Sequence, residues 1–171
     1  MERLKESGPP VRVLALGNEL LADDALGAWA AREVERRYGD AAEVVFSSAA
    51  GVRLIDYFEG ASQIIVIDSI VTGQAAPGTV HLFGENDLAG VPGPAGHSLG
   101  IFDVLRMMRK AELPAPEVLG VIAVEAVDCV TFGAPIHWSV QSALPEVVRL
   151  VGELLGEARG VLTARGAPRH A

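Results

Sequence analysis

The chain has 171 residues, half of them hydrophobic, and a formal net charge of −8. This length suits one domain with a sizeable core, and the acidic balance argues against nucleic acid, whose phosphates would be repelled. The single cysteine excludes an internal disulfide framework and fits a reducing cytoplasm. No apolar run approaches the roughly 18 residues of a membrane span, and the first ten residues lack the apolar segment of a signal peptide. We therefore expect one cytoplasmic domain over residues 1–171, with loose ends at 1–10 and 160–171 and no membrane insertion.

The first predicted element is a buried strand at Val11–Leu16, which is almost wholly apolar. The pair G-N then breaks the run, and a loop ends in the acids Asp23 and Asp24. Apolar residues recur at helical spacing from there to Tyr38, which predicts an amphipathic helix. An acid at the start of a helix commonly caps it or interacts with its dipole, and we expect that role for Asp23.

Further strands are predicted at Glu43–Phe46, Gln63–Asp68, Thr79–Phe83 and Val118–Val124. The connection before Thr79–Phe83 has no helical pattern, which favours an antiparallel orientation for that strand. Helices are expected at 51–58, directly after His97, and from Pro135 to about Leu155 with a kink or break at Pro145. Strands that alternate with helices predict an α/β fold: a three-layer sandwich with a central, mostly parallel, twisted sheet of about five strands and helices on both faces.

Two carboxylates and an imidazole are expected at one edge of this sheet. Asp24 follows the first strand, Asp68 closes the third, and His97 precedes a helix. Ligands of parallel sheets bind beyond the carboxyl ends of the strands. Two acids and a histidine form a mixed oxygen and nitrogen site, which suits nickel or zinc and leaves positions for water or substrate. A histidine before a helix is also commonly structural, so spacing alone leaves both interpretations open.

Two other readings of the sequence are weaker. Cys129 could be a nucleophile with His137 nearby in sequence, but free cysteine is commonly buried and we interpret it as an inert thiol. The opening order of strand, glycine turn and helix also fits a dinucleotide-binding module. Its fingerprint G-x-G-x-x-G is absent, because the next glycine after Gly17 is Gly27, and a pyrophosphate needs the missing glycines for close approach.

Residues 17–27, G-N-E-L-L-A-D-D-A-L-G, resemble the signature of the nickel–iron hydrogenase maturation endopeptidases, roughly G-N-x-L-x-x-D-[DE]-x-x-G. The segments I-I-V-I-D-S-I-V and G-H-S-L-G-I-F-D-V-L follow in the family's order, and the second is similar to the family's H-Q-x-G-x-x-D-x-L. A later V-I-A-V-E matches the family's fourth strand-to-loop region. The resemblance runs from about Val11 to Leu155. Ser98 replaces the commoner glutamine, and Ala25 stands where many members have glycine.

This resemblance implies an endopeptidase that removes the C-terminal extension from a hydrogenase large-subunit precursor after nickel insertion. By motif, the residues that recognise the nickel fall on Asp24, Asp68 and His97, and the two acids are the candidate catalytic residues. The nickel is expected to arrive with the substrate, and another divalent metal such as zinc could take its place in vitro.

The route of hydrolysis stays open at this stage. The metal could polarise the scissile carbonyl or acidify a bound water, or Asp24 or Asp68 could act as the base that activates water. A nickel-binding maturation chaperone or sensor without hydrolytic activity would need the same ligands, and it is the alternative function.

Overall fold

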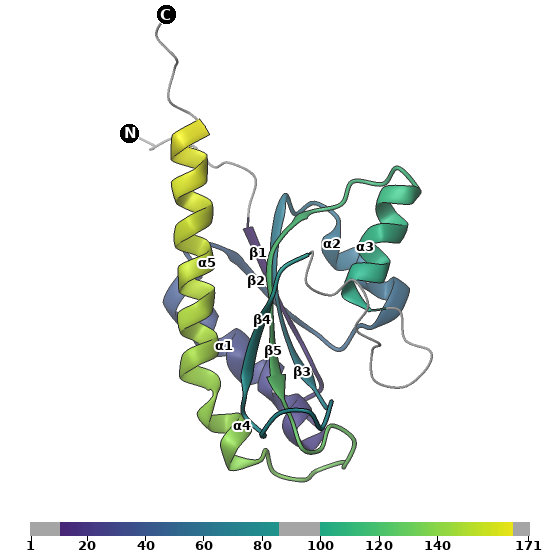
Figure 1. The fold of residues 1–171 in the computed structure, drawn as a ribbon, viewed down its shortest axis with the longest axis vertical. Helices are drawn as coiled ribbons and strands as arrows, with labels where there is room; N and C mark the ends of the chain where they lie inside the picture. Colours follow the sequence, from purple (N-terminus) through teal and green to yellow (C-terminus); the bar gives the residue numbers. More distant parts are fainter. Residues whose placement is uncertain (1–10, 86–99, 166–171) are drawn as a thin grey trace, which may run out of the picture.

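The computed structural model describes residues 11–85 and 100–165, and side chains up to residue 158. A five-stranded sheet in the order β2-β1-β3-β5-β4 lies between two layers of helices (Figure 1). The strands are β1 (Val11–Leu16), β2 (Glu43–Ser47), β3 (Gln63–Ile70), β4 (Val80–Phe83) and β5 (Glu117–Glu125). The helical elements are η1 (Ala22–Ala25), α1 (Leu26–Tyr38), η2 (Gly51–Leu54), α2 (Ile55–Phe58), α3 (Ile101–Lys110), α4 (Trp138–Ser142) and α5 (Leu144–Arg165). The predicted three-layer α/β sandwich is confirmed.

The sheet is parallel except for β4. Strand β1 pairs in parallel with β2 and β3, and β3 pairs in parallel with β5. Strand β4 pairs antiparallel with β5 at the edge of the sheet, as expected for a strand that follows no crossover helix. The parallel strands therefore all end at one edge of the sheet, toward the bottom of Figure 1. We call this the carboxyl edge, at Leu16, Ser47, Ile70 and Glu125.

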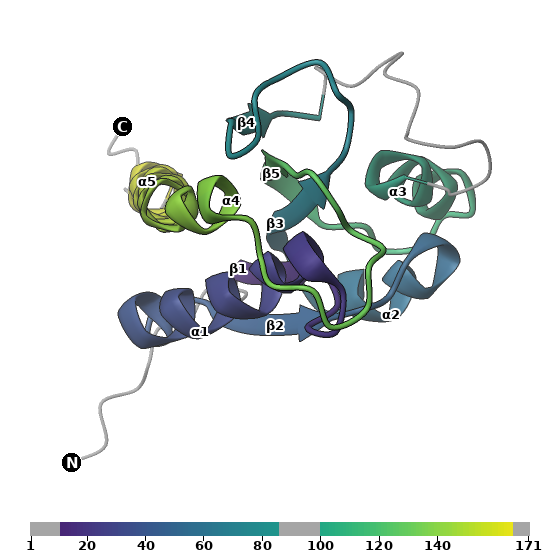
Figure 2. The ribbon, with the colours of Figure 1, turned by 90° about the horizontal axis from the view of Figure 1, so that it is seen from below.

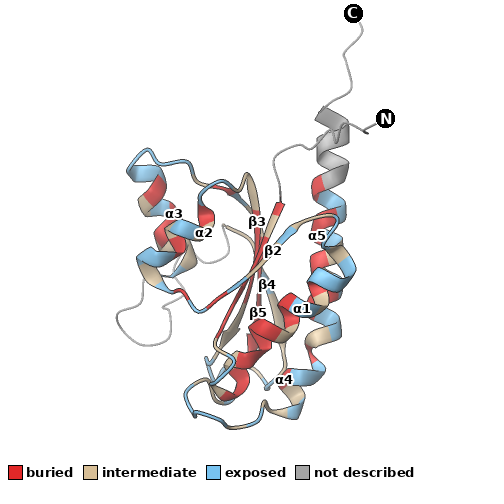
Figure 3. Ribbon diagram, turned by 180° about the vertical axis from the view of Figure 1, so that it is seen from behind, coloured by how far each residue is buried: buried red, intermediate tan, exposed pale blue. Residues whose placement is uncertain are grey.

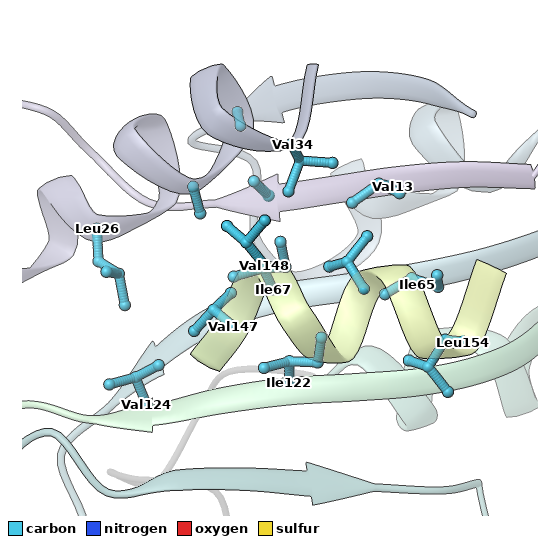
Figure 4. Packing of buried hydrophobic residues seen from close by; sticks show 14 of the residues in the cluster. Val13, Leu26, Val34, Ile65, Ile67, Ile122, Val124, Val147, Val148 and Leu154 are labelled. Atoms are coloured by element: carbon cyan, nitrogen blue, oxygen red, sulfur yellow. The ribbon is translucent and has the colours of Figure 1, made fainter. Parts of the chain in front are cut away.

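Both faces of the central strands are buried, and successive side chains serve opposite faces. Val13 and Ala15 of β1 pack with residues of α1 and α5, whereas Leu14 and Leu16 pack with residues of α2 and α3. Figure 3 shows the buried positions on both sides of the sheet, and Figure 4 shows the first of these clusters. Burying one such side chain contributes about 1.5–3 kcal/mol. This two-sided burial explains why the strands read as continuous apolar runs.

Two glycines of the 17–27 segment are required by close contact between backbones. A Cβ atom on Gly27 would lie 2.0 Å from the carbonyl oxygen of Leu16, and one on Gly17 would lie 2.1 Å from that of Asp24. Gly17 also has a φ of +149°, which side chains disfavour. These glycines let α1 begin directly against the end of β1, which fixes where Asp24 lies.

The C-terminal helical region differs from the sequence expectation. The expected single helix is divided: α4 ends at Ser142 and α5 begins at Leu144. Pro145, expected at a kink or break, stands in the first turn of α5 just after this break, where its missing N–H group costs nothing. Helix α5 then continues to Arg165, past the predicted end at Leu155. In the described ranges, no helix has the length and hydrophobicity needed to cross a membrane.

The buried carboxylate of Asp23 ties the loop of residues 126–137 to η1. Its Oδ2 accepts hydrogen bonds from the N–H groups of Val127 at 2.8 Å and Asp128 at 3.1 Å, and its Oδ1 accepts one from the N–H of His137 at 2.6 Å. The side chain is 1% exposed. Neither η1 nor α1 has a side-chain N-cap, so the capping half of the prediction for Asp23 is wrong, although Asp23 does stand in the first turn of η1. Its partners lie more than 100 residues further along the chain.

We predict that Asp23→Asn destabilises the protein strongly. The amide would turn an N–H₂ group toward backbone N–H donors, leaving at least one buried donor unpaired, so the free energy of unfolding should fall by about 2–4 kcal/mol. Urea unfolding followed by circular dichroism measures the loss. Asp40→Asn is the matched control, because Asp40 is exposed and its change should stay within about 0.5 kcal/mol. Equal stabilities of the two variants would contradict the role of Asp23.

Candidate functional site

The structure brings Asp24 and Asp68 to the carboxyl edge, as the sequence predicts. Asp24 lies in η1, which follows β1 after a short loop, and Asp68 lies near the end of the adjacent parallel strand β3. Figure 2 looks onto this edge and shows η1 beside the ends of the central strands. The third predicted ligand, His97, lies outside the described residues.

Ser69 connects the two acids. Its hydroxyl donates a hydrogen bond to Oδ1 of Asp24 at 2.7 Å, and its backbone N–H donates one to Oδ1 of Asp68 at 2.9 Å. Sequence reasoning missed this residue. The available signal was a hydroxyl side chain directly after the acid near the end of a buried strand. One residue therefore holds one oxygen of each carboxylate.

The environment of Asp68 disfavours its charged form. Burial of the carboxyl group among protein atoms raises its pKa from 3.8 to about 7. The hydrogen bond from the N–H of Ser69 opposes this rise, and the nearby negative charge of Asp24 adds to it. The metal-free site therefore holds a carboxyl group that exchanges its proton near neutral pH, and opposite charge brought into the site would favour the ionised form.

Cys129 also lies at this edge, but its thiol is not activated. Its Sγ lies 3.5 Å from Oγ of Ser69. Burial raises the pKa of the thiol to about 11; the hydrogen bond to Ser69 opposes the rise, and the nearby aspartates add to it. The Nδ1 atom of His137 accepts a hydrogen bond from the N–H of Ser139 at 3.3 Å. Nucleophilic cysteines need a lowered pKa, so these observations support the interpretation of an inert thiol, half-buried here.

A second buried carboxylate holds the loop after β3. Glu125, one residue beyond the strand predicted at Val118–Val124, ends β5 and is 1% exposed. It accepts hydrogen bonds from the N–H and hydroxyl of Thr72 and from the N–H of Gly73, at 2.7–2.8 Å. Burial opposes ionisation of Glu125, but these bonds outweigh it and lower the pKa of the carboxyl group. The loops on both sides of the site are thus held by buried acids.

The described part of the chain supplies two of the three predicted metal ligands. Among the described residues, no group of three or more His, Cys, Asp or Glu is arranged to hold a metal ion. Asp103 accepts a hydrogen bond from the N–H of Gly100 at 3.1 Å and so helps to set the start of α3. This start lies close in sequence to His97.

Exposed apolar side chains lie on the loops that carry the site. Leu20, Val130 and Phe132 are 57%, 82% and 74% exposed, and we call them the apolar rim. A bridge between Leu21 and Phe132, together with a 2.8 Å hydrogen bond from the N–H of Gly133 to the carbonyl of Leu20, brings the two loops together. Figure 2 shows the loop after β5 passing across the carboxyl edge. Exposed apolar groups next to a polar site are typical of a surface that binds another macromolecule.

We predict that Asp68→Asn stabilises the metal-free protein, and only at neutral to alkaline pH. Because the folded state keeps a proton that the unfolded state has lost, stability falls as the pH rises from about 4 to about 7. Asparagine resembles the protonated acid and keeps an acceptor for Ser69. One pKa unit corresponds to ~1.4 kcal/mol, so the variant should be more stable by about 2–4 kcal/mol at about pH 8 and nearly equal at about pH 4. Urea unfolding with a chelator at both pH values measures this, and a difference that does not change with pH would contradict it.

The comparisons with known proteins agree on one family. A family model described as hydrogenase maturation protease matches residues 29–153, a range that includes Asp68 and His97 and begins after Asp24. The Hydrogenase 2 maturation protease of Escherichia coli strain K12 is 28% identical over 149 residues, covering 84% of this chain and 91% of that protein. The hydrogenase expression/formation protein HupD of Bradyrhizobium diazoefficiens is 28% identical over 162 residues, covering 92% of this chain and 84% of that protein.

Solved structures of maturation endopeptidases have a similar fold. The solved structure of the hydrogenase maturating endopeptidase HybD from E. coli superposes with a TM-score of 0.70 and 24% identity, covering 87% of this chain and 93% of that one. The HybD structure from Thermococcus kodakarensis gives a TM-score of 0.63, also at 24% identity, over 85% and 99% of the two chains. The family model covers most of the chain, and the sequence motifs, the curated relatives and the fold all agree with it. This protein is therefore a peptidase and belongs to the hydrogenase maturation protease family.

Proposed function

We propose that this protease removes the C-terminal extension from a nickel-loaded hydrogenase large-subunit precursor, and that Asp24, Asp68 and His97 recognise the nickel. The observation that carries the proposal is the pair of carboxylates held side by side by Ser69 at the carboxyl edge. The role of His97 comes from its place in the sequence motif.

The donor set suits nickel. Ser69 occupies one oxygen of each acid, and in residues 11–85 and 100–158 no hydrogen bond reaches the second oxygen of either. Carboxylate oxygens and an imidazole nitrogen are ligands that a borderline divalent ion accepts, and zinc could replace nickel in vitro. The ion is part of the substrate, so the acids have a partner only after the precursor has been loaded. Cleavage would therefore wait for nickel insertion.

Two routes can activate water at this site. A bound ion can polarise the scissile carbonyl or lower the pKa of a water molecule. Alternatively, one of the two acids can act as the general base, for which it must lie within hydrogen-bond reach of the water. Both routes use the same pair of carboxylates, and both require them to face the bond that is cleaved.

The family assignment favours a protease over the alternative of a nickel-binding chaperone or sensor. The relatives are named as a maturation protease and a maturating endopeptidase. The direct test is incubation with a nickel-loaded precursor. A mass loss equal to a C-terminal peptide supports the protease, whereas an intact precursor bound to this protein would support the chaperone.

We predict that Asp24→Asn, Asp68→Asn and His97→Ala each lower the rate of precursor processing by roughly 1,000-fold or more, because each removes a group that touches the nickel or the water. Mass spectrometry of the precursor over time measures the rate. Cys129→Ala is the control and should process at the normal rate, since its thiol is not activated. Full processing by any one of the three variants would remove that residue from the site.

The apolar rim should contribute to binding of the precursor. We predict that Phe132→Ser raises KM for the precursor by roughly 10-fold with little change in kcat, because the loss of one exposed aromatic contact weakens binding without touching the reacting atoms. Leu113→Ser is the matched control: Leu113 is 42% exposed and lies between α3 and the start of β5, at the opposite end of the sheet. An unchanged KM for Phe132→Ser, or an equal rise for Leu113→Ser, would contradict the rim as a docking surface.

A further inference from the structure

We propose that Ser69 is a positioning residue that aims the free oxygens of Asp24 and Asp68 at the nickel of the precursor. This inference rests on the proposed function. Its basis is geometric: the hydroxyl of Ser69 lies 2.7 Å from Oδ1 of Asp24, and its backbone N–H lies 2.9 Å from Oδ1 of Asp68. The three residues come from η1 and β3, two adjacent elements at the carboxyl edge.

The arrangement matters because a carboxylate rotates easily about its last bond. The terminal torsion of aspartate is broad and has no strong preferred well. A hydrogen bond to one oxygen restricts that rotation and so directs the other oxygen. Among the described residues, Oε1 of Gln63 is the only buried side-chain nitrogen or oxygen atom that lacks a hydrogen-bond partner. No oxygen of Asp24 or Asp68 is both buried and without a partner. The oxygens that Ser69 leaves free are therefore open to a ligand.

The two contacts of Ser69 differ in what they demand of the sequence. The backbone N–H that reaches Asp68 is present in every residue except proline, whereas the contact to Asp24 needs a side-chain hydroxyl. The hydroxyl donates its proton to Asp24 at 2.7 Å, and its oxygen lies 3.5 Å from Sγ of Cys129. Replacing the hydroxyl therefore releases Asp24 and leaves the restraint on Asp68 in place.

A positioning role makes a different prediction from a nucleophilic one. Groups that orient metal ligands from behind typically change activity by 10–100-fold when removed. A nucleophile is indispensable, and its attack on the scissile carbonyl would form an ester to Ser69 with release of the C-terminal peptide. A positioning role for Ser69 therefore predicts that its replacement lowers activity by roughly 10–100-fold, whereas a nucleophilic role predicts a complete loss.

The test compares Ser69→Ala, Ser69→Thr and a matched control in the processing of nickel-loaded precursor. The control is Ser142→Ala, which removes a hydroxyl that donates one hydrogen bond of 2.7 Å to the carbonyl of Trp138, in α4. We expect Ser69→Ala to lower kcat by roughly 10–100-fold with KM within about 2-fold, Ser69→Thr to recover most of the rate, and Ser142→Ala to match the wild type. Urea unfolding should show that all three variants fold.

Three outcomes would overturn the inference. A Ser69→Ala variant with the wild-type kcat would show that the hydroxyl orients nothing, and the proposed function would still stand. A complete loss in Ser69→Ala, with a covalent adduct on Ser69 of the wild-type protein by mass spectrometry, would make it a nucleophile. Absence of cleavage by the wild-type protein, with the loaded precursor cut by a known maturation protease, would overturn the proposed function and this role with it.

Discussion

The hydrogen bonds to the buried carboxylate of Asp23 hold the carboxyl edge together. They attach the long loop after β5 to the short helix after β1, across more than 100 residues of sequence. A buried carboxylate is tolerated only when its oxygens are fully bonded, so this loop has little freedom to move away. The adjacent residue Asp24 takes no part in these hydrogen bonds, so its carboxylate can bind a ligand.

Neighbouring acids therefore have different tasks because their surroundings differ. Asp23 accepts hydrogen bonds from backbone N–H groups, and Glu125 from two backbone N–H groups and the hydroxyl of Thr72, and both acids stabilise loops. Asp24 and Asp68 each have one restrained oxygen and sit close enough for the charge of one to raise the pKa of the other. Two neighbouring acids that are partly removed from water lower the stability of the folded protein. Such unfavourable arrangements are typical of functional sites. A positive ion would relieve this repulsion directly.

Much of the fold could be predicted from local sequence patterns. Apolar runs such as Val11–Leu16 identified the buried strands, and the helix-free connection before β4 identified its antiparallel orientation. The meeting of Asp24 with Asp68 followed from parallel strands alone, since their ends share an edge. The family motif added the expected chemistry and the role of His97, which stays a prediction.

Contacts between segments that are distant along the chain could not be predicted from the sequence. Asp23 stands where a helix cap would, and nothing nearby indicates partners in the loop after β5. Glu125 lies just beyond the strand predicted at Val118–Val124, and its burial depends on donors in the segment after β3, which its own neighbours in sequence do not indicate. Ser69 lies within the I-I-V-I-D-S-I-V segment, but nothing in that segment singles out its hydroxyl; its importance comes from the contact with Asp24 of η1. Pro145 was expected to kink or break the last helix, and the break between α4 and α5 falls directly before it.

The central claim is that Asp24, Asp68 and His97 converge on one nickel ion. Anomalous diffraction at the nickel absorption edge, from crystals of this protein in complex with nickel or with the loaded precursor, tests it most directly. We expect one nickel peak within coordination distance of both carboxylates and of the imidazole of His97, with Oδ1 of Asp24 still bonded to Ser69. A nickel peak away from the carboxyl edge, or one that contacts neither carboxylate, would contradict it.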